Sequence, residues 1–227
     1  CLITGFGQDG PYAHRAGYDY IIQGMSGLMS VTGDPQGQPQ RTGVAVTDLF
    51  TGLYSVAGIL AALHQRGQTG RGQHIDMSLL DCAVATTANQ SLNYLATGEA
   101  PGRIGNVHPN LTPYQVFDCS DGHIIIACGN DNQFERLARL VGLSEGELDD
   151  NRTNARRVEN RAVLAARIAD VMRNDTRAHW LDALEQVRAD HPVEMIQIGH
   201  QIAEDEKTDP CGMSLEPTLV QSDLTHR

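Results

Sequence analysis

The sequence has few cysteines and no pattern that would pair them. Five occur in 227 residues, an odd number, widely separated and without a C-x-x-C pair. This distribution excludes the disulfide framework of a small secreted domain and argues against a zinc site. The nine histidines show no metal-ligand spacing, so we expect no metal. The sequence therefore predicts reduced thiols and a cytoplasmic protein.

Basic residues are also scarce. The chain has 17 lysines and arginines against 28 acidic residues, a net charge of −11. This balance argues against nucleic-acid and anionic-membrane partners, although a local basic pocket for a phosphorylated ligand stays possible. We see no signal peptide and no uninterrupted apolar run of bilayer length, so no membrane partner is expected.

What is present is a soluble globular composition, 41% hydrophobic and 20% charged. The chain opens on "CLITGFG", an apolar run without a polar lead-in, which is typical of a core strand. We therefore expect an N-terminally truncated chain, the later part of a longer protein.

The periodicity predicts two parts, an α/β part followed by a smaller α+β part. In the first part it predicts strands at 1–4 and 74–80 and helices at 18–32, 46–65 and 81–98. The helix at 46–65 is apolar around much of its surface, so we expect burial on more than one side. Asp81 is placed as the cap of the last of these helices.

The second part begins after a stretch rich in Gly, Pro and Asn. The sequence predicts a hairpin at 114–129 and helices at 132–143, 152–174 and 177–189. The expected domains are 1–97, a linker at 98–113, a small domain at 114–190 and an atypical tail at 191–227.

One acid, Asp48, lies in the otherwise apolar and small-residue run "GVAVTDLFTG" at 43–52. An aspartate at a helix start commonly accepts hydrogen bonds from unpaired backbone N–H groups. A helix N-terminus also keeps a carboxylate ionised, and an ionised carboxylate can act as a covalent nucleophile. The local sequence favours the cap, and the two interpretations are compatible.

Two other short segments are ambiguous in the same way. Tyr18 and Asp19 fit a surface turn, and Gly129 fits a strand-to-helix turn with Asn130 or Asp131 capping the next helix. Local sequence favours these structural interpretations over functional ones.

Several separated motifs together resemble the class III coenzyme A transferases, the family of formyl-CoA transferase with α-methylacyl-CoA racemase as a branch. The matching segments are "ITGFGQDGPYAHRAGYDYIIQGMSGLMSVTG", "GVAVTDLFTGLYS", "TGRGQHIDMSLLD", "GNVHPNLTPYQVF" and "GNDNQF". The pattern is most similar to the transferases that use short dicarboxylates such as succinate. The resemblance implies a partial Rossmann-like large domain, a smaller α+β domain and an interlocked homodimer.

The resemblance also implies a site. It places the catalytic aspartate at Asp48, with Tyr18 and Asp19 lining the site beside it. It matches the glycine loop that closes over the intermediate to Gly129, Asn130, Asp131 and Gln133. Asp48 is then expected to face an open cavity near that loop.

The implied reaction moves coenzyme A between an acyl-CoA and a free carboxylic acid, through an aspartyl anhydride and an aspartyl-CoA thioester. The CoA thioester is a substrate, and no permanently bound cofactor is expected. Tyr18 stands where the racemase branch has a catalytic histidine, which favours transfer over racemisation. A non-catalytic fragment is the remaining alternative, and the resemblance fades after about residue 187.

Overall fold

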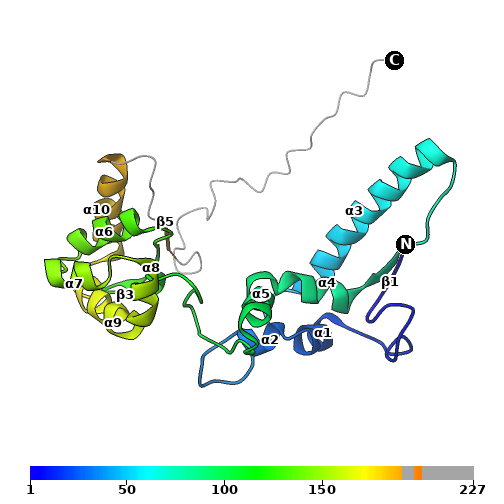
Figure 1. The fold of residues 1–227 in the computed structure, drawn as a ribbon, viewed down its shortest axis with the longest axis horizontal. Coiled ribbons are helices and arrows are strands. Elements are labelled where there is room, and N and C mark those ends of the chain that lie inside the picture. Colours follow the sequence, from blue (N-terminus) through cyan, green and yellow to red (C-terminus); the bar gives the residue numbers. More distant parts are fainter. Residues whose placement is uncertain (191–196, 201–227) are drawn as a thin grey trace, which may run out of the picture. The chain divides into compact units, whose positions relative to one another are not determined.

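The computed structural model describes residues 1–190 and 197–200, with backbone only at 188–190 and 197–200 (Figure 1). The chain divides into two compact units, Cys1–Pro109 and Asn110–Arg227. The division falls within the stretch 98–113. Before it, the backbone N–H of Gly105 donates to the Gly33 carbonyl in unit 1, at 3.1 Å. The predicted linker is thus hydrogen-bonded to the rest of unit 1 at Gly105.

Unit 1 combines helices with a small parallel sheet. Its elements are β1 (Leu2–Thr4), α1 (Asp19–Met25), α2 (Leu28–Val31), α3 (Val46–Thr69), β2 (Asp76–Ser78), α4 (Leu79–Thr86) and α5 (Ala88–Thr97). In the sheet, Leu2 pairs with Asp76 and Thr4 with Ser78. The core of this unit is small and gathers around Ile22, Leu79 and Ala83.

Two of the predicted helices in unit 1 are each split in two. The stretch 18–32 breaks at Gly27, whose φ of +86° takes the chain out of the helix before α2 begins. The stretch 81–98 divides into α4 and α5. The prediction of Asp81 as a cap is wrong, because the helix starts earlier and the Ser78 hydroxyl accepts from the Asp81 N–H.

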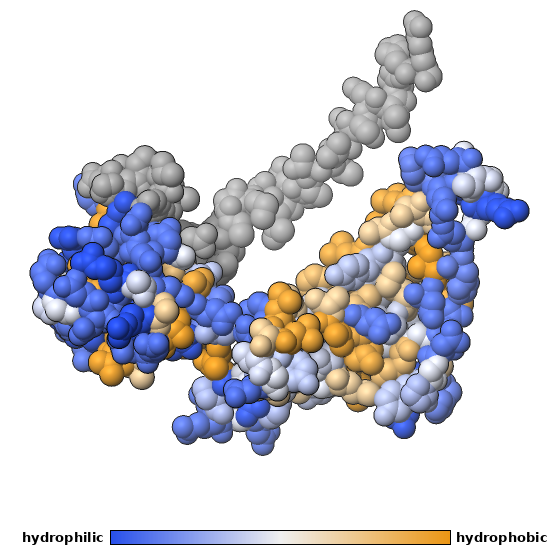
Figure 2. All heavy atoms as spheres, viewed as in Figure 1, coloured by the Kyte–Doolittle hydropathy of each residue, from blue (hydrophilic) through white to orange (hydrophobic). Residues whose placement is uncertain are grey.

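Helix α3 buries its hydroxyl face rather than its apolar one. Thr47, Thr51 and Ser55 are buried, and the Thr51 and Ser55 hydroxyls donate to carbonyls one turn back, at 2.6 and 2.7 Å. The exposed apolar side chains of the helix are Leu49, Phe50, Leu53, Tyr54, Val56, Ile59, Leu60 and Leu63. Figure 2 shows apolar residues gathered over this part of unit 1. The predicted burial on more than one side is therefore wrong within the described residues, since α3 contacts only α1, α4 and β2 substantially.

By length and composition, α3 is the one described helix that could cross a membrane. Core helices of soluble proteins meet the same criterion, so this is weak evidence for a span. The expectation that no segment reaches bilayer length did not anticipate this helix.

Unit 2 is an antiparallel sheet covered by helices. Its described elements are β3 (Tyr114–Cys119), β4 (Gly122–Ala127), α6 (Asp131–Leu140), α7 (Glu145–Asp150), α8 (Asn154–Glu159), α9 (Arg161–Met172), α10 (Arg177–Asp190) and β5 (Gln197–His200). The predicted hairpin is confirmed, with Tyr114 opposite Ala127. Strand β5 adds to β4 and lies in the stretch 191–227 that was expected to be an atypical tail.

The helices of unit 2 differ from prediction in two places. Helix α7 was missed, although it begins with a capping box in which Ser144 and Glu147 exchange hydrogen bonds. The predicted helix at 152–174 breaks at Asn160 into α8 and α9. A continuous core including Phe117, Phe134 and Trp180 joins the sheet to these helices. This unit therefore holds most of the buried apolar surface.

Candidate functional site

Asp48 lies in the first turn of α3 and is not the cap of its helix. The N-cap position is Ala45, which has no side chain able to cap. The Asp48 side chain is exposed, and among the described residues it has no hydrogen-bond partner. The open cavity that Asp48 is expected to face stays a prediction.

The cap of α3 comes instead from α1. Asp19 Oδ1 accepts from the backbone N–H and the hydroxyl of Thr47, at 3.0 and 2.7 Å. Its Oδ2 accepts from the amide of Gln23 at 2.8 Å. Both carboxylate oxygens of Asp19 are thus engaged by the protein, and direct contact of Asp19 with a substrate stays a prediction.

Tyr18 is 76% exposed and stands at the N-cap of α1. Its place is set by a close backbone contact between Gly17 and Gly5, which follows β1. A Cβ on Gly5 would lie 2.5 Å from the Gly17 Cα, so only glycine fits without a shift. The contact holds the segment of Tyr18 and Asp19 against the end of β1.

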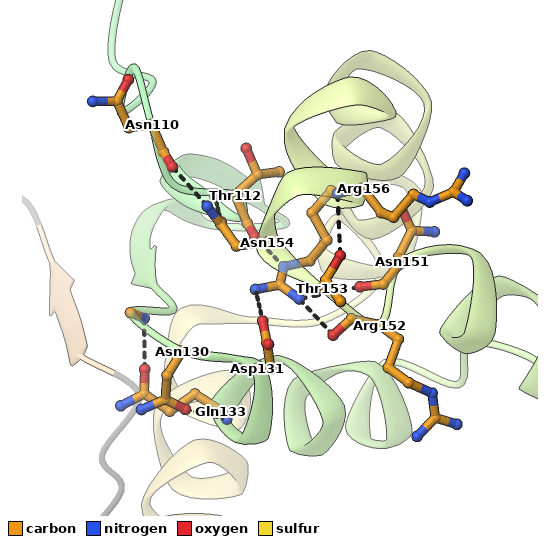
Figure 3. Close-up of polar contacts among 12 residues, drawn as sticks. Asn110, Thr112, Asn130, Asp131, Gln133, Asn151, Arg152, Thr153, Asn154 and Arg156 are labelled. Carbon is orange, nitrogen blue, oxygen red and sulfur yellow. Dashed lines mark hydrogen bonds and ion pairs between the residues drawn. The ribbon is translucent and has the colours of Figure 1, made fainter. Parts of the chain in front are cut away.

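The turn after β4 is built from mutual hydrogen bonds (Figure 3). Asn130 caps α6, accepting from the Gln133 N–H at 2.9 Å, and the Gln133 side chain accepts from the Gly129 N–H at 2.6 Å. The cap prediction is confirmed for Asn130. In this state the Gly129 N–H is occupied, and a role in binding substrate stays a prediction for these residues.

Asp131 pairs with Arg157, which sequence reasoning missed. Arg157 is 1% exposed, and its guanidinium donates to Asp131 Oδ1 at 2.7 Å. The other donors reach the backbone carbonyls of Thr112 at 2.7 Å and of Asn151 and Arg152 at 3.1 Å each (Figure 3). One arginine thereby ties the entry to β3, the end of α7 and the start of α6 together.

Cys128, beside Gly129, is buried, and burial raises the pKa of its thiol to about 12. Since the thiolate is the reactive form, we expect iodoacetamide at pH 8.5 to modify Cys128 about 10³-fold more slowly than the exposed Cys1. Peptide mass spectrometry measures both rates, and unfolding in denaturant should equalise them. Similar rates in the native protein would contradict the burial.

The same burial has a consequence for stability. Below pH 9 the Cys128 thiol is protonated in the folded and the unfolded chain, and its full stabilisation is present. Above pH 9 the unfolded chain loses this proton first, so the free energy of unfolding falls as pH rises towards 12, by at most about 1.4 kcal/mol per pH unit. Cys128→Ala should flatten this part of the pH profile.

The predicted site residues form two groups. Tyr18, Asp19 and Asp48 belong to unit 1 and are linked through Thr47, whereas the Gly129 turn belongs to unit 2. Their assembly into one site stays a prediction. Within the described ranges, no group of three or more His, Cys, Asp or Glu side chains is placed to hold a metal ion.

The chain matches known proteins along most of its length. The model of CoA-transferase family III covers residues 1–219, past residue 187 where the resemblance was expected to fade. A succinate–glutarate CoA-transferase of Agrobacterium fabrum is 56% identical over 163 residues, 71% of this chain and 40% of that protein. A succinyl-CoA:glutarate CoA-transferase of Mus musculus is 43% identical over 187 residues, 82% of this chain and 43% of that protein.

The fold agrees with these sequence matches. A crystal structure of a CaiB/BaiF family protein from Brucella suis superposes with a TM-score of 0.70 at 50% identity, covering 87% of this chain and 51% of that one. The chain thus spans about half the length of its relatives, or less. With a family match over residues 1–219 and a shared mixed α/β fold, the chain belongs to CoA-transferase family III.

Proposed function

We propose that the complete protein transfers coenzyme A from succinyl-CoA to a short dicarboxylic acid such as glutarate, with Asp48 as the nucleophile. One observation carries this proposal: Asp48 stands at the start of α3 with its carboxylate unengaged, because Asp19 caps the helix in its place. The substrates follow the names of the relatives, which act on succinate and glutarate.

The first half of the reaction puts the acyl group on the enzyme. A carboxylate oxygen of Asp48 attacks the thioester carbonyl of succinyl-CoA, the carbon–sulfur bond breaks, and CoA leaves as a thiolate. The product is a mixed anhydride of Asp48 and succinate. The thiolate then attacks the aspartyl carbonyl, which releases succinate and leaves CoA on Asp48 as a thioester.

The second half runs the same steps backwards. A glutarate carboxylate attacks the aspartyl thioester to form a new anhydride and CoA thiolate. The thiolate attacks the glutaryl carbonyl, and Asp48 is returned as a carboxylate. Enzyme and substrates are all carboxylates, so no step needs to be steeply uphill.

Each tetrahedral intermediate carries an oxyanion that needs a hydrogen-bond donor. One well-placed donor is worth about 3–4 kcal/mol. The Gly129 N–H is a candidate, but it donates to Gln133 in the structure and would have to exchange that bond for the substrate. Glycine at this turn lets the backbone approach the acyl group closely and exclude water from the anhydride.

A second function, acyl-CoA racemisation, is less well supported. It needs a base that titrates near neutrality, and the tyrosine hydroxyl of Tyr18 is a poor base at that pH. A non-catalytic chain that keeps the fold is the other alternative. Binding of succinyl-CoA, measured by titration, separates that alternative from the two enzymatic ones.

For the whole protein we further propose a cytoplasmic, interlocked homodimer with a Rossmann-like large domain. The exposed apolar side of α3 supports a buried position for this helix in such an assembly. The Leu53 and Leu60 side chains are 66% and 61% exposed, and removing such apolar surface from water is favourable.

Trapping tests the nucleophile. We expect hydroxylamine, added with succinyl-CoA to the complete protein, to convert Asp48 into a hydroxamate, because it intercepts both the anhydride and the thioester. Peptide mass spectrometry locates the modification, with a sample lacking succinyl-CoA as the control. An unmodified Asp48 in a protein that still turns over would overturn the covalent route.

A further inference from the structure

We propose that Gln23 is a positioning residue for Asp48, acting through Asp19 and the loop before α3. The inference rests on the proposed function, because it assigns a second task to the same site. The inference starts from the burial of a polar side chain, which hydrophobic packing alone does not require. Gln23 is polar yet completely buried, in a unit whose core is small.

Both ends of the Gln23 amide are hydrogen-bonded, although the single proton of the Thr42 hydroxyl is shared with the Val44 carbonyl, 3.0 Å away. Its nitrogen donates to Asp19 Oδ2 at 2.8 Å and to the Val44 carbonyl at 3.3 Å. Its oxygen accepts from the backbone N–H and the hydroxyl of Thr42, at 2.9 and 3.3 Å. Burying a polar group costs free energy unless it is paired, so this amide holds its partners in one arrangement.

Those partners lie on either side of the turn that starts α3. Thr42 and Val44 precede the helix, and Asp19 accepts from the backbone N–H of Thr47, the residue before Asp48. A continuous set of hydrogen bonds therefore runs from the loop through Gln23 and Asp19 to the first turn of the helix. Because Ala45 offers no cap of its own, this set fixes where the turn begins and where Asp48 points.

Gln23 touches neither the substrate nor Asp48 directly, so its loss should act on geometry. A misplacement of about 1 Å costs on the order of 10²-fold in rate. We expect Gln23→Leu, which keeps the volume and removes the amide, to slow the acylation of Asp48 by succinyl-CoA by about 10²-fold. The KM for succinyl-CoA should stay unchanged, as no contact with it is lost.

A charge exchange across the pair gives a sharper test. Asp19→Asn alone sets an amide nitrogen against the Gln23 nitrogen, and Gln23→Glu alone sets two carboxylates together. The double variant Asp19→Asn/Gln23→Glu restores a donor facing an acceptor between the two positions, although the hydrogen bond to the Val44 carbonyl stays lost and the rescue is therefore partial. We expect it to acylate about tenfold faster than either single variant, as coupled neighbours do. A purely substrate-binding role for Asp19 would not give this rescue.

Ser55→Ala is the matched control. It removes one buried hydrogen bond from α3, to the Thr51 carbonyl, but lies two turns beyond the start of the helix. We expect its acylation rate to equal that of the parent. Circular dichroism and thermal unfolding of the complete protein establish which variants fold, and the double variant decides the question if Gln23→Leu does not.

The outcomes separate the two proposals. If Asp48→Asn keeps its turnover, the proposed function fails whatever the Gln23 variants do. If Asp48→Asn is inactive while folded Gln23→Leu acylates at the parent rate, the positioning role is overturned and the proposed function stands. A folded double variant that is no faster than the single variants also overturns it.

Discussion

Asp48→Asn is expected to abolish CoA transfer while leaving the fold intact. The amide has nearly the shape of the carboxylate but cannot form an anhydride, so turnover should fall by at least about 10⁴-fold. The stability cost should be only about 0.3–1 kcal/mol, from the lost interaction with the helix dipole. Steady-state assays with succinyl-CoA and glutarate, beside thermal unfolding, measure both effects.

Asp81→Asn is the matched control for this experiment. Asp81 is also an exposed aspartate in the first turn of a helix, α4, so its substitution loses the same dipole interaction. It should reproduce the small loss in stability with full activity. Substantial turnover by the Asp48 variant would remove Asp48 from the chemistry.

Arg157→Met should have the largest effect on stability. The substitution removes every hydrogen bond of the buried guanidinium, and the carbonyls of Thr112, Asn151 and Arg152 lose a donor. The ionic partner Asp131 is 55% exposed and stays solvated, so the cost comes from the carbonyls left without a donor, at about 1–3 kcal/mol for each one that is buried. Denaturant unfolding monitored by Trp180, which is buried in the core of the same unit, reports the change.

Two further variants make this result specific. Arg156→Met changes the neighbouring exposed arginine on α8 and should cost no more than about 0.5 kcal/mol. Arg157→Lys keeps the charge but loses the planar fork, so it should recover only a small part of the stability. Equal stability of the Arg156 and Arg157 variants would show that the buried cluster contributes nothing.

The sequence predicted the hairpin and the long helix because their signals are local. Alternating apolar residues on either side of "DCSDGH" predict two paired strands, and the structure has them as β3 and β4. The apolar periodicity from Val46 onwards predicts α3, which continues to Thr69. Where helices were wrongly joined, the breaks lie at Gly27, Thr87 and Asn160, which an apolar repeat alone does not detect.

Residues whose task depends on distant partners could not be assigned in this way. The cap of α3 comes from Asp19, 28 residues before Thr47, and nothing near Asp48 indicates it. Arg157 is one of three arginines between positions 152 and 157, and nothing in the local sequence shows that it is the buried one. Its partner Asp131 lies 26 residues earlier in the chain, a pairing that the local sequence does not indicate.

Because the backbones of Gly5 and Gly17 are in close contact, the residues allowed at one position depend on the residue at the other. A methyl group on either residue would stand 2.5–2.6 Å from the Cα of the other, so enlarging one cannot be compensated by any choice at its neighbour. The only adjustment left is to separate two stretches of main chain, which would carry Tyr18 away from the strand end. Neither position therefore tolerates a single substitution by a larger residue while this contact is kept.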